Sequence, residues 1–394
     1  METIPFHRPF IGKEEEEAAL RVLRSGWLTT GKEALAFEEE FHTFLSGKNS
    51  VPGNFYCLAV NSATSGLHLA LEALGIGRGD AVLLPSYTFT ATSEVVRYLG
   101  AEAVFVDIEN DSYNIDLQAL ERAIVQLTGT ATGKLKSCLI PKAIIPVHLG
   151  GFPCNMPAIN ALARKYNMSV VEDAAHAFPA KTQDGQWAGC CSDIGVFSFY
   201  ATKTITTGEG GMVVTASKET AARISIMRSH GIDRSVWNRY TDTGASWYYE
   251  VVEPGFKYNL SDLLAAVGRV QLSRAMELLS MRQKIAKRYD NAFANQTAFS
   301  IMPSNGARHL YTIRLRNAGK RNAFIESLHK VGIGTSVHYI PLHIMPYYRD
   351  RYSLKPEDFP HSYQRYKETV SLPIWPGMTE TQIDRVIGAV LENL

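Results

Sequence analysis

The sequence has no excess of charge of either sign. Its 40 lysine and arginine residues nearly balance 39 aspartate and glutamate residues, so the formal net charge is +1. A strong charge bias would favour nucleic acid or a membrane surface as partner, and none exists here. No apolar stretch is long enough to span a bilayer, and the first residues, METIPFHRPFIGKEEEE, lack the pattern of a signal peptide. We therefore expect a cytoplasmic protein that binds neither nucleic acid nor membranes.

The cysteines show neither a metal-binding nor a disulfide pattern. The chain has five, an odd number, and no two stand in CxxC spacing. Free thiols in a reducing compartment are the simplest interpretation. The spacing of His148, His338 and His343 fits no common zinc pattern, so we predict no metal site.

Short apolar stretches alternate with segments of helical periodicity in the first 250 residues. Strands are predicted at residues 58–60, 81–84, 102–108, 143–148, 169–172, 194–199 and 211–215, and helices at 14–24, 33–46, 67–74 and 90–99. This order predicts an α/β fold, a mostly parallel sheet with helices on both faces. The segment GIGRGD follows a helix and precedes a strand, the reverse of a dinucleotide-binding turn, which argues against that class.

The last third of the chain has a different pattern. A long helix is predicted at residues 262–293, followed by a strand at 308–315, a helix at 321–331, a strand at 334–339 and a helix at 379–394. Residues 125–140 are polar and are expected to form a surface loop. We predict a large domain over residues 1–250, including the N-terminal helices, and a small α+β domain over residues 251–394.

A lysine follows the predicted strand at 194–199 in a segment rich in small residues, FSFYATKTITTGEGG. Small residues let another group approach the backbone closely. Lys203 in this position could form a Schiff base with an aldehyde cofactor. Taken alone, a lysine after a strand is more often a surface charge.

Three other segments could serve the same cofactor. Asp173, at the end of a buried strand, could pair with a pyridine nitrogen, although an aspartate there often caps a helix. Residues 62–66 begin a helix and could bind a phosphate through free amides, although Ser and Thr are ordinary caps. Phe89 could stack on a ring, or belong to the core. All follow predicted strands, where open parallel sheets bind ligands, so their joint occurrence favours one site.

With these segments in place, the sequence resembles the DegT/DnrJ/StrS aminotransferases, sugar enzymes of the fold-type I pyridoxal-phosphate (PLP) class. The resemblance covers nearly the whole chain. It rests on NSATSGLHLALEALGIGRGD, PSYTFTAT, VVEDAAHA, FSFYATKTITTGEGGMVVT, GFKYNLSDLLAAVGRVQL and GIGTSVHYIPLH. It implies an aspartate-aminotransferase-like fold.

The resemblance also implies roles for single residues. Lys203 matches the lysine that carries PLP, Asp173 the partner of the pyridine nitrogen, and His176 a residue beside the phenolic oxygen. Asn259 matches a residue that reaches the phosphate of the neighbouring subunit, which implies a homodimer with shared active sites. The full cofactor-binding set would be Ser62, Ala63, Thr64, Ser65, Phe89, Asp173, Ala175, His176, Ser198, Lys203 and Asn259.

The implied reaction moves an amino group from L-glutamate, through pyridoxamine phosphate, to a nucleotide-linked keto-sugar. A 4-keto-6-deoxy sugar for bacterial surface polysaccharide is weakly favoured. The candidate substrate residues are Arg228, Arg234, His338, Tyr339 and His343. Three alternatives stay open: a sugar dehydratase of the same family, which carries His where this chain has Lys203; a PLP enzyme acting on another keto substrate, such as an amino-acid enzyme; and a non-catalytic regulatory protein.

Overall fold

A seven-stranded sheet forms the centre of the computed structural model, which describes residues 2–47, 55–129, 138–233, 248–302 and 306–394. The strand order is β1-β7-β6-β5-β4-β2-β3. In this sheet β7 runs in the opposite direction to the other strands. The strands are β1 (Tyr56–Val60), β2 (Asp80–Pro85), β3 (Glu102–Val106), β4 (Ile140–Ile144), β5 (Ser169–Asp173), β6 (Ile194–Ser198) and β7 (Gly211–Thr215).

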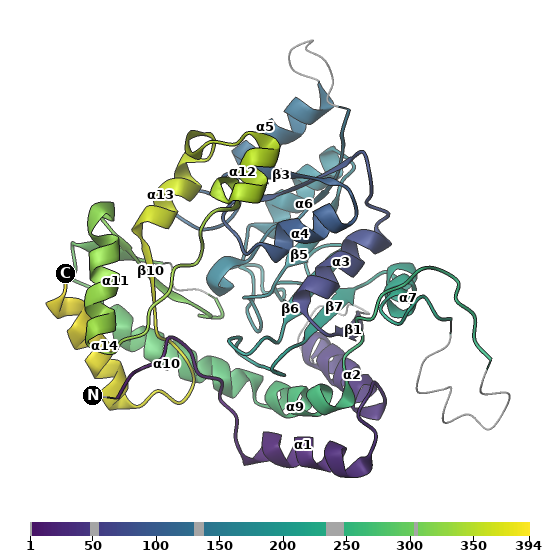
Figure 1. Ribbon diagram of the computed structural model, residues 1–394, viewed down its shortest axis with the longest axis horizontal. Coiled ribbons are helices and arrows are strands. Elements are labelled where there is room, and N and C mark those ends of the chain that lie inside the picture. Colours follow the sequence, from purple (N-terminus) through teal and green to yellow (C-terminus); the bar gives the residue numbers. More distant parts are fainter. Residues whose placement is uncertain (1, 48–54, 130–137, 234–247, 303–305) are drawn as a thin grey trace.

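Helices cover both faces of this sheet (Figure 1). Alternate side chains of each strand point to opposite faces, and two sets of apolar clusters result. One face packs against α3 (Ala63–Ala73), α4 (Ala91–Tyr98) and α7 (Lys218–Met227). The other packs against α2 (Lys32–Ser46), α5 (Leu117–Thr128), α6 (Met156–Lys165) and α9 (Asp262–Ser273), with α1 (Lys13–Ser25) outside α9. The predicted α/β class and parallel sheet are confirmed.

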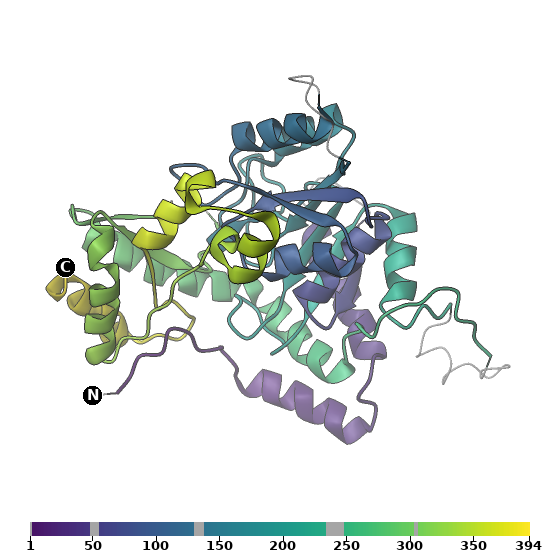
Figure 2. The same cartoon turned by 45° about the horizontal axis from the view of Figure 1, so that its top comes forward.

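A smaller antiparallel sheet follows, in the order β10-β9-β8, with both chain termini beside its helices (Figure 2). Its strands are β8 (Phe299–Ile301), β9 (Tyr311–Leu315) and β10 (Thr369–Leu372), and its helices are α10 (Ala275–Phe293), α11 (Arg321–Lys330) and α14 (Glu380–Glu392). Thr379 caps α14 by accepting a hydrogen bond from the amide of Gln382. Short helices complete the chain: α12 (Pro346–Tyr352), α13 (Pro360–Glu368), η1 (Leu149–Gly151), η2 (Ala318–Lys320), η3 (Leu342–Ile344) and η4 (Pro356–Asp358).

The two sheets have separate apolar cores. Ile4 packs into the core of the smaller sheet, whereas Leu278 near the start of α10 packs into the core of the central sheet. Tyr348 and Phe359 also return to the central sheet. We still propose a division into domains 1–250 and 251–394. Each of the four residues just named packs into the core of the other proposed domain.

Several predicted elements differ from those observed. The long helix at 262–293 is two helices that meet at Arg274, so that α9 packs on α1 and α2 while α10 continues to the small sheet. The strand predicted at 334–339 is wrong. The amide of Gly334 donates to the carbonyl of Ile4, and that of Ser336 to the carbonyl of Ser371. The segment therefore changes its pairing partner after one bridge, and no continuous strand forms. The loop predicted at 125–140 is partly helix, since α5 continues to Thr128; its residues 130–137 lie outside the described ranges.

A buried carboxylate holds together two loops that follow strands of the central sheet. Glu172 of β5 has no exposed surface and accepts bonds from four donors. These are His148 Nε2 at 2.9 Å, the amides of Gly189 at 2.8 Å and Cys191 at 2.6 Å, and Ser192 Oγ at 2.9 Å. The loops after β4 and β5 are therefore held to one side chain, next to Asp173.

Among the described residues, no helix has both the length and the apolar character that a membrane crossing requires.

Candidate active site

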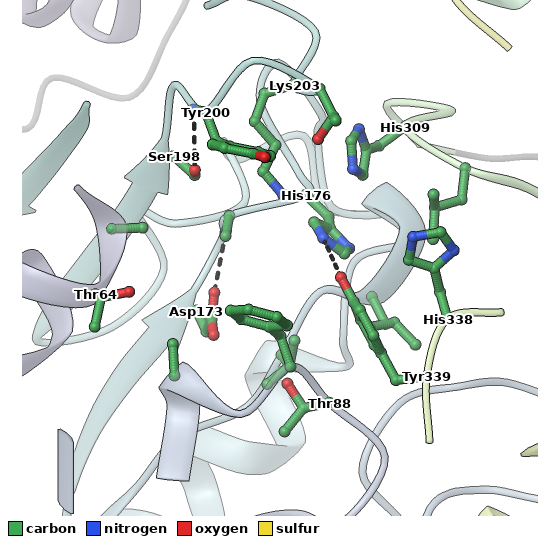
Figure 3. A pocket seen from close by; sticks show the side chains of 18 of the residues that line it. Thr64, Thr88, Asp173, His176, Ser198, Tyr200, Lys203, His309, His338 and Tyr339 are labelled. Carbon is green, nitrogen blue, oxygen red and sulfur yellow. Dashed lines mark hydrogen bonds between the residues drawn. The ribbon is translucent and has the colours of Figure 1, made fainter. Parts of the chain in front are cut away.

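A cavity of about 560 Å³ lies where β1, β2, β5 and β6 end, in the size range of small-molecule sites. Most of the predicted site residues line it: Ser62, Ala63, Thr64, Phe89, Asp173, Ala175, His176, Ser198, Lys203, His338 and Tyr339. Figure 3 shows Asp173, Lys203 and His176 directed into the same space, with His338 and Tyr339 arriving from another part of the chain. Segments far apart in sequence thus converge as predicted.

Other predicted residues do not line this cavity. Ser65 is buried one turn into α3, where its hydroxyl donates to the carbonyl of Ser62 at 2.7 Å. The side chain of Asn259 accepts a bond from Lys257 Nζ at 2.6 Å and lies outside its own chain's cavity. Arg228 donates to the carbonyl of Ala59 at 2.7 Å and pairs with Glu38.

The remaining two substrate candidates also lie elsewhere. His343 is fully buried against the ring of Phe359, with 4.6 Å between ring centroids. Its burial lowers the pKa of its imidazole to about 4, so the ring is neutral near pH 7. Arg234 lies outside the described residues. Substrate contact by Arg228, Arg234 or His343 stays a prediction.

One end of the cavity is the amino terminus of α3. Ser62 caps the helix, and its Oγ accepts a bond from the amide of Ser65 at 3.1 Å. The next amides, of Ala63 and Thr64, belong to the first turn, where helices leave N–H groups free and the dipole favours an anion. Gly211 of β7 makes this close packing possible, because a Cβ there would lie 2.8 Å from the nitrogen of Ala63. This end suits a phosphate.

Asp173 supplies a buried negative charge at the end of β5. The residue is 5% exposed. One carboxylate oxygen accepts a bond from Thr92 Oγ1 at 2.8 Å, and the other from the amide of Ala175 at 3.2 Å. Burial raises the pKa of this carboxyl above its ordinary value, and the bond from Thr92 opposes that rise. A cation bound beside it would be strongly favoured.

Lys203 supplies an amine on a half-buried side chain that lines the cavity. Its backbone closes a turn after β6, with its amide bonded to the carbonyl of Tyr200 at 2.9 Å. Burial lowers the pKa of the amine to about 7; the charge of Asp173 works against this shift and that of Arg282 adds to it. A large fraction of the amine is therefore neutral and nucleophilic near neutral pH.

His176 and Tyr339 form a hydrogen-bonded pair in which the direction of the bond can be assigned. The amide of Gly150 donates to His176 Nδ1 at 3.2 Å, so that nitrogen carries no proton. Burial holds the pKa of His176 well below its usual value, and the neutral ring has its proton on Nε2. Nε2 therefore donates to the Tyr339 oxygen, 3.1 Å away (Figure 3). The hydroxyl hydrogen of Tyr339 remains available to a ligand.

The cavity also contains residues that the sequence analysis missed, including Phe6, His7, Thr88, Tyr200 and His309. The ring of His309 lies 4.3 Å from that of His176, between centroids. Burial lowers the pKa of His309 well below its ordinary value and that of His7 to about 4. The imidazoles in this wall are thus neutral hydrogen-bonding groups. No set of three ligating side chains among the described residues is arranged to hold a metal ion.

Comparison with known proteins places this architecture in a family. The profile of the DegT/DnrJ/EryC1/StrS aminotransferase family matches residues 9–391, nearly the whole chain. The chain belongs to this family. This aminotransferase is 42% identical over 395 residues to the spore coat polysaccharide biosynthesis protein SpsC of Bacillus subtilis, a match that covers 98% of this chain and 96% of SpsC.

Solved structures agree with the family assignment. The putative sugar aminotransferase Spr1654 of Streptococcus pneumoniae, in its PMP form, is 30% identical and superposes with a TM-score of 0.86 over 98% of each chain. PseC of Helicobacter pylori, an aminotransferase of pseudoaminic acid biosynthesis, is 29% identical with a TM-score of 0.86, over 100% of this chain and 99% of PseC. The aminotransferase thus has the aspartate-aminotransferase-like fold of the fold-type I class.

Enzymes of this family use PLP and its amine form, pyridoxamine phosphate. The side chains in the cavity fit this cofactor. A helix amino terminus offers amides to a phosphate, Asp173 offers a buried carboxylate to a ring cation, and Lys203 offers an amine held partly neutral. No described lining residue needs to move out of a salt bridge to make these groups available.

The bond from Thr92 to Asp173 generates a first prediction. Thr92→Val should weaken PLP binding roughly 10- to 150-fold, because a hydrogen bond to a buried charge contributes roughly 1.5–3 kcal/mol. Equilibrium titration of the PLP-free protein would measure this. Thr92→Ser keeps the hydroxyl and is the matched control. Equal PLP affinity in wild type, Thr92→Ser and Thr92→Val would contradict the role of this bond.

Proposed function

We propose that the protein transfers an amino group from L-glutamate to a nucleotide-linked keto-sugar, with a weak preference for a 4-keto-6-deoxy sugar. The observation that carries this proposal is the composition of the cavity wall. Beside the amine of Lys203 and the buried carboxylate of Asp173 stand His309, His338 and Tyr339, which suit a ligand rich in hydroxyl groups. SpsC is named for polysaccharide biosynthesis and PseC for pseudoaminic acid biosynthesis, which supports a sugar substrate.

The cofactor would be held at three points. The first turn of α3 and Ser198 would bind the phosphate, Asp173 would pair with the pyridine nitrogen, and Phe89 would lie against the ring. The side chain of Phe89 lines the cavity and is 54% exposed, so a ligand bound there would cover it. When bound, PLP withdraws electrons and so stabilises negative charge on the reacting carbon.

Lys203 would move the proton. When its amine is free, Nζ would carry a proton between the cofactor carbon and the substrate carbon that flank the transferred nitrogen, as a general base and then a general acid. That role needs a pKa near the working pH, and burial lowers the pKa of Lys203 to about 7. Asp173 would keep its charge beside the ring throughout, held by Thr92.

The polar wall would orient the sugar. The hydroxyl hydrogen of Tyr339 is free because His176 donates to its oxygen. Burial raises the pKa of Tyr339, so this hydroxyl stays protonated and can donate to a sugar oxygen. His338 shares a bond with Ser371 Oγ at 2.9 Å, which fixes the ring that faces the cavity.

The alternatives have less support. A dehydratase of this family carries histidine where this chain has Lys203. An amino-acid enzyme commonly binds its substrate carboxylate through arginine, and no described residue that lines the cavity is an arginine. A regulatory protein would not need a lysine in the cavity beside a buried aspartate, whose charge is costly to bury without a ligand.

We also propose a cytoplasmic homodimer with shared sites. Asn259 lies outside its own chain's cavity. Its backbone pairs with Val60, the last residue of β1, which precedes α3. Tyr200 and Phe89 leave the cavity open on one side, at 47% and 54% exposure. A second copy that brought Asn259 to the phosphate end would complete the site.

A second prediction concerns Lys203. The purified protein should be yellow, and borohydride should fix PLP to a peptide that contains Lys203, as peptide mass spectrometry would show. Lys203→Ala should abolish transamination but still bind PLP. Lys165→Ala, on the exposed surface of α6, is the control and should retain activity. A trapped cofactor on any other lysine would exclude this role for Lys203.

A third prediction tests the shared site. When Lys203→Ala and Asn259→Ala proteins are dissociated and mixed, each mixed dimer should contain one intact site. Random pairing should restore roughly a quarter of wild-type activity, since half of the dimers are mixed. Mixing Lys203→Ala with Asp173→Asn is the control, because no mixed dimer then has an intact site. A fully active monomer in sedimentation would contradict the proposal.

A fourth prediction concerns the substrate. The enzyme in its amine form should react with UDP- or dTDP-4-keto-6-deoxy sugars, regain the visible absorbance of PLP and give a product with one more amino group. The nucleotide should serve as a remote handle that orients the ketone, so the free keto-sugar should lose turnover as well as affinity. Reaction with simple 2-oxo acids alone, and with no nucleotide-sugar in a broad panel, would instead support the amino-acid alternative.

A further inference from the structure

Arg282 of α10 is a buried arginine at the back of the cavity. It has no exposed surface. Its guanidinium donates to three backbone carbonyls: Ile374 at 2.9 Å, His309 at 3.2 Å and Thr202 at 3.3 Å. Within the described ranges no carboxylate forms an ion pair with it, whereas the buried Arg228 pairs with Glu38 and Arg308 with Asp290.

A buried charge without a counter-ion is expensive. Three carbonyls accept bonds from its two terminal nitrogens, while Nε is buried without a partner among the described residues. The carbonyl dipoles do not cancel its charge, and a methionine of similar shape would avoid the desolvation cost. Burial lowers the pKa of Arg282 to about 10, still high enough for the group to stay charged at pH 7. A cost of this kind points to a use for the charge itself.

The three carbonyls belong to segments that line the cavity. Thr202 directly precedes Lys203, His309 precedes β9, and Ile374 follows β10, so they come from both sheets. The guanidinium therefore joins the turn that carries the lysine to the opposite wall. A rigid planar fork of donors fixes such a geometry better than an ammonium group.

The charge of Arg282 also acts across the cavity. It lowers the pKa of Lys203, although burial lowers that pKa more and the charge of Asp173 raises it. It adds to the burial effect that lowers the pKa of His7 and His309. The titratable and charged groups that line the cavity with Lys203 or stand behind it are His7, Asp173, His176, Tyr200, Glu209, Arg282, His309, His338 and Tyr339. Among these described groups, Arg282 is the strong base that opposes Asp173.

We propose that Arg282 is a positioning residue for Lys203, which fixes the turn that carries the lysine and opposes protonation of its amine. This inference rests on the proposed role of Lys203 as the proton-moving group. Without Arg282, Asp173 would act unopposed and the amine would be more fully protonated near neutral pH.

The test measures the titration of Lys203 in the PLP-free full-length protein. Brief labelling with acetic anhydride from pH 5 to 11, followed by mass spectrometry of the Lys203 peptide, gives the midpoint of the amine. The wild-type midpoint should lie near 7. Arg282→Met should raise it by about one unit, which lowers the neutral fraction at pH 7 roughly fivefold. Arg282→Lys, which keeps the charge, should stay near the wild-type midpoint.

The control is Arg269→Met on α9, which removes an arginine paired with Glu33 and Glu40 and should leave the Lys203 midpoint unchanged. An unchanged midpoint in folded Arg282→Met would overturn the inference. If that variant does not fold, a wild-type midpoint near the ordinary value of about 10.4 would overturn it equally. The labelling needs neither PLP nor sugar, so its outcome is independent of the substrate and trapping experiments.

Discussion

The position of the active site depends on the buried carboxylate of Glu172. It lies in the interior of β5 and receives four hydrogen bonds from the loops after β4 and β5. Because successive side chains of a strand point to opposite sides, Asp173 is directed elsewhere, into the cavity. Two adjacent acids thus have different functions: one holds loops together, and the next presents charge to a ligand. Loss of Glu172 would leave its donors without partners in a dry interior, at a cost of about 1–3 kcal/mol for each.

A balance of buried charges governs the chemistry inside the cavity. Burial alone drives Lys203 toward its neutral form and Asp173 toward its protonated form, and their mutual attraction resists both changes. Arg282 shifts this balance further toward a neutral lysine. The surrounding imidazoles stay neutral and therefore add hydrogen-bonding capacity without adding charge. The site can combine one fixed anion with one amine whose proton is mobile.

Much of the fold and the centre of the site could be predicted from local sequence. Lys203, Asp173, Phe89 and the first turn of α3 each follow a strand with a readable apolar pattern. Parallel strands bring such positions to one edge of a sheet, so their convergence follows from topology. The capping residues Ser62 and Thr379 were equally readable, because a cap is a contact between residues three apart.

The rest depended on contacts that local sequence does not encode. His7 and His309 carry no motif, and they reach the cavity because the N-terminal segment and the small sheet pack beside the Lys203 turn. The segment at 334–339 has the composition of a strand, but it passes between Ile4 and Ser371 and pairs with each only once. The sequence by itself determined the parallel sheet and the lysine and aspartate at its edge, since both follow from short-range patterns. Only the tertiary structure decided which neutral imidazoles form the wall and that Arg282 stands behind the lysine, because these depend on how α10 crosses between two sheets.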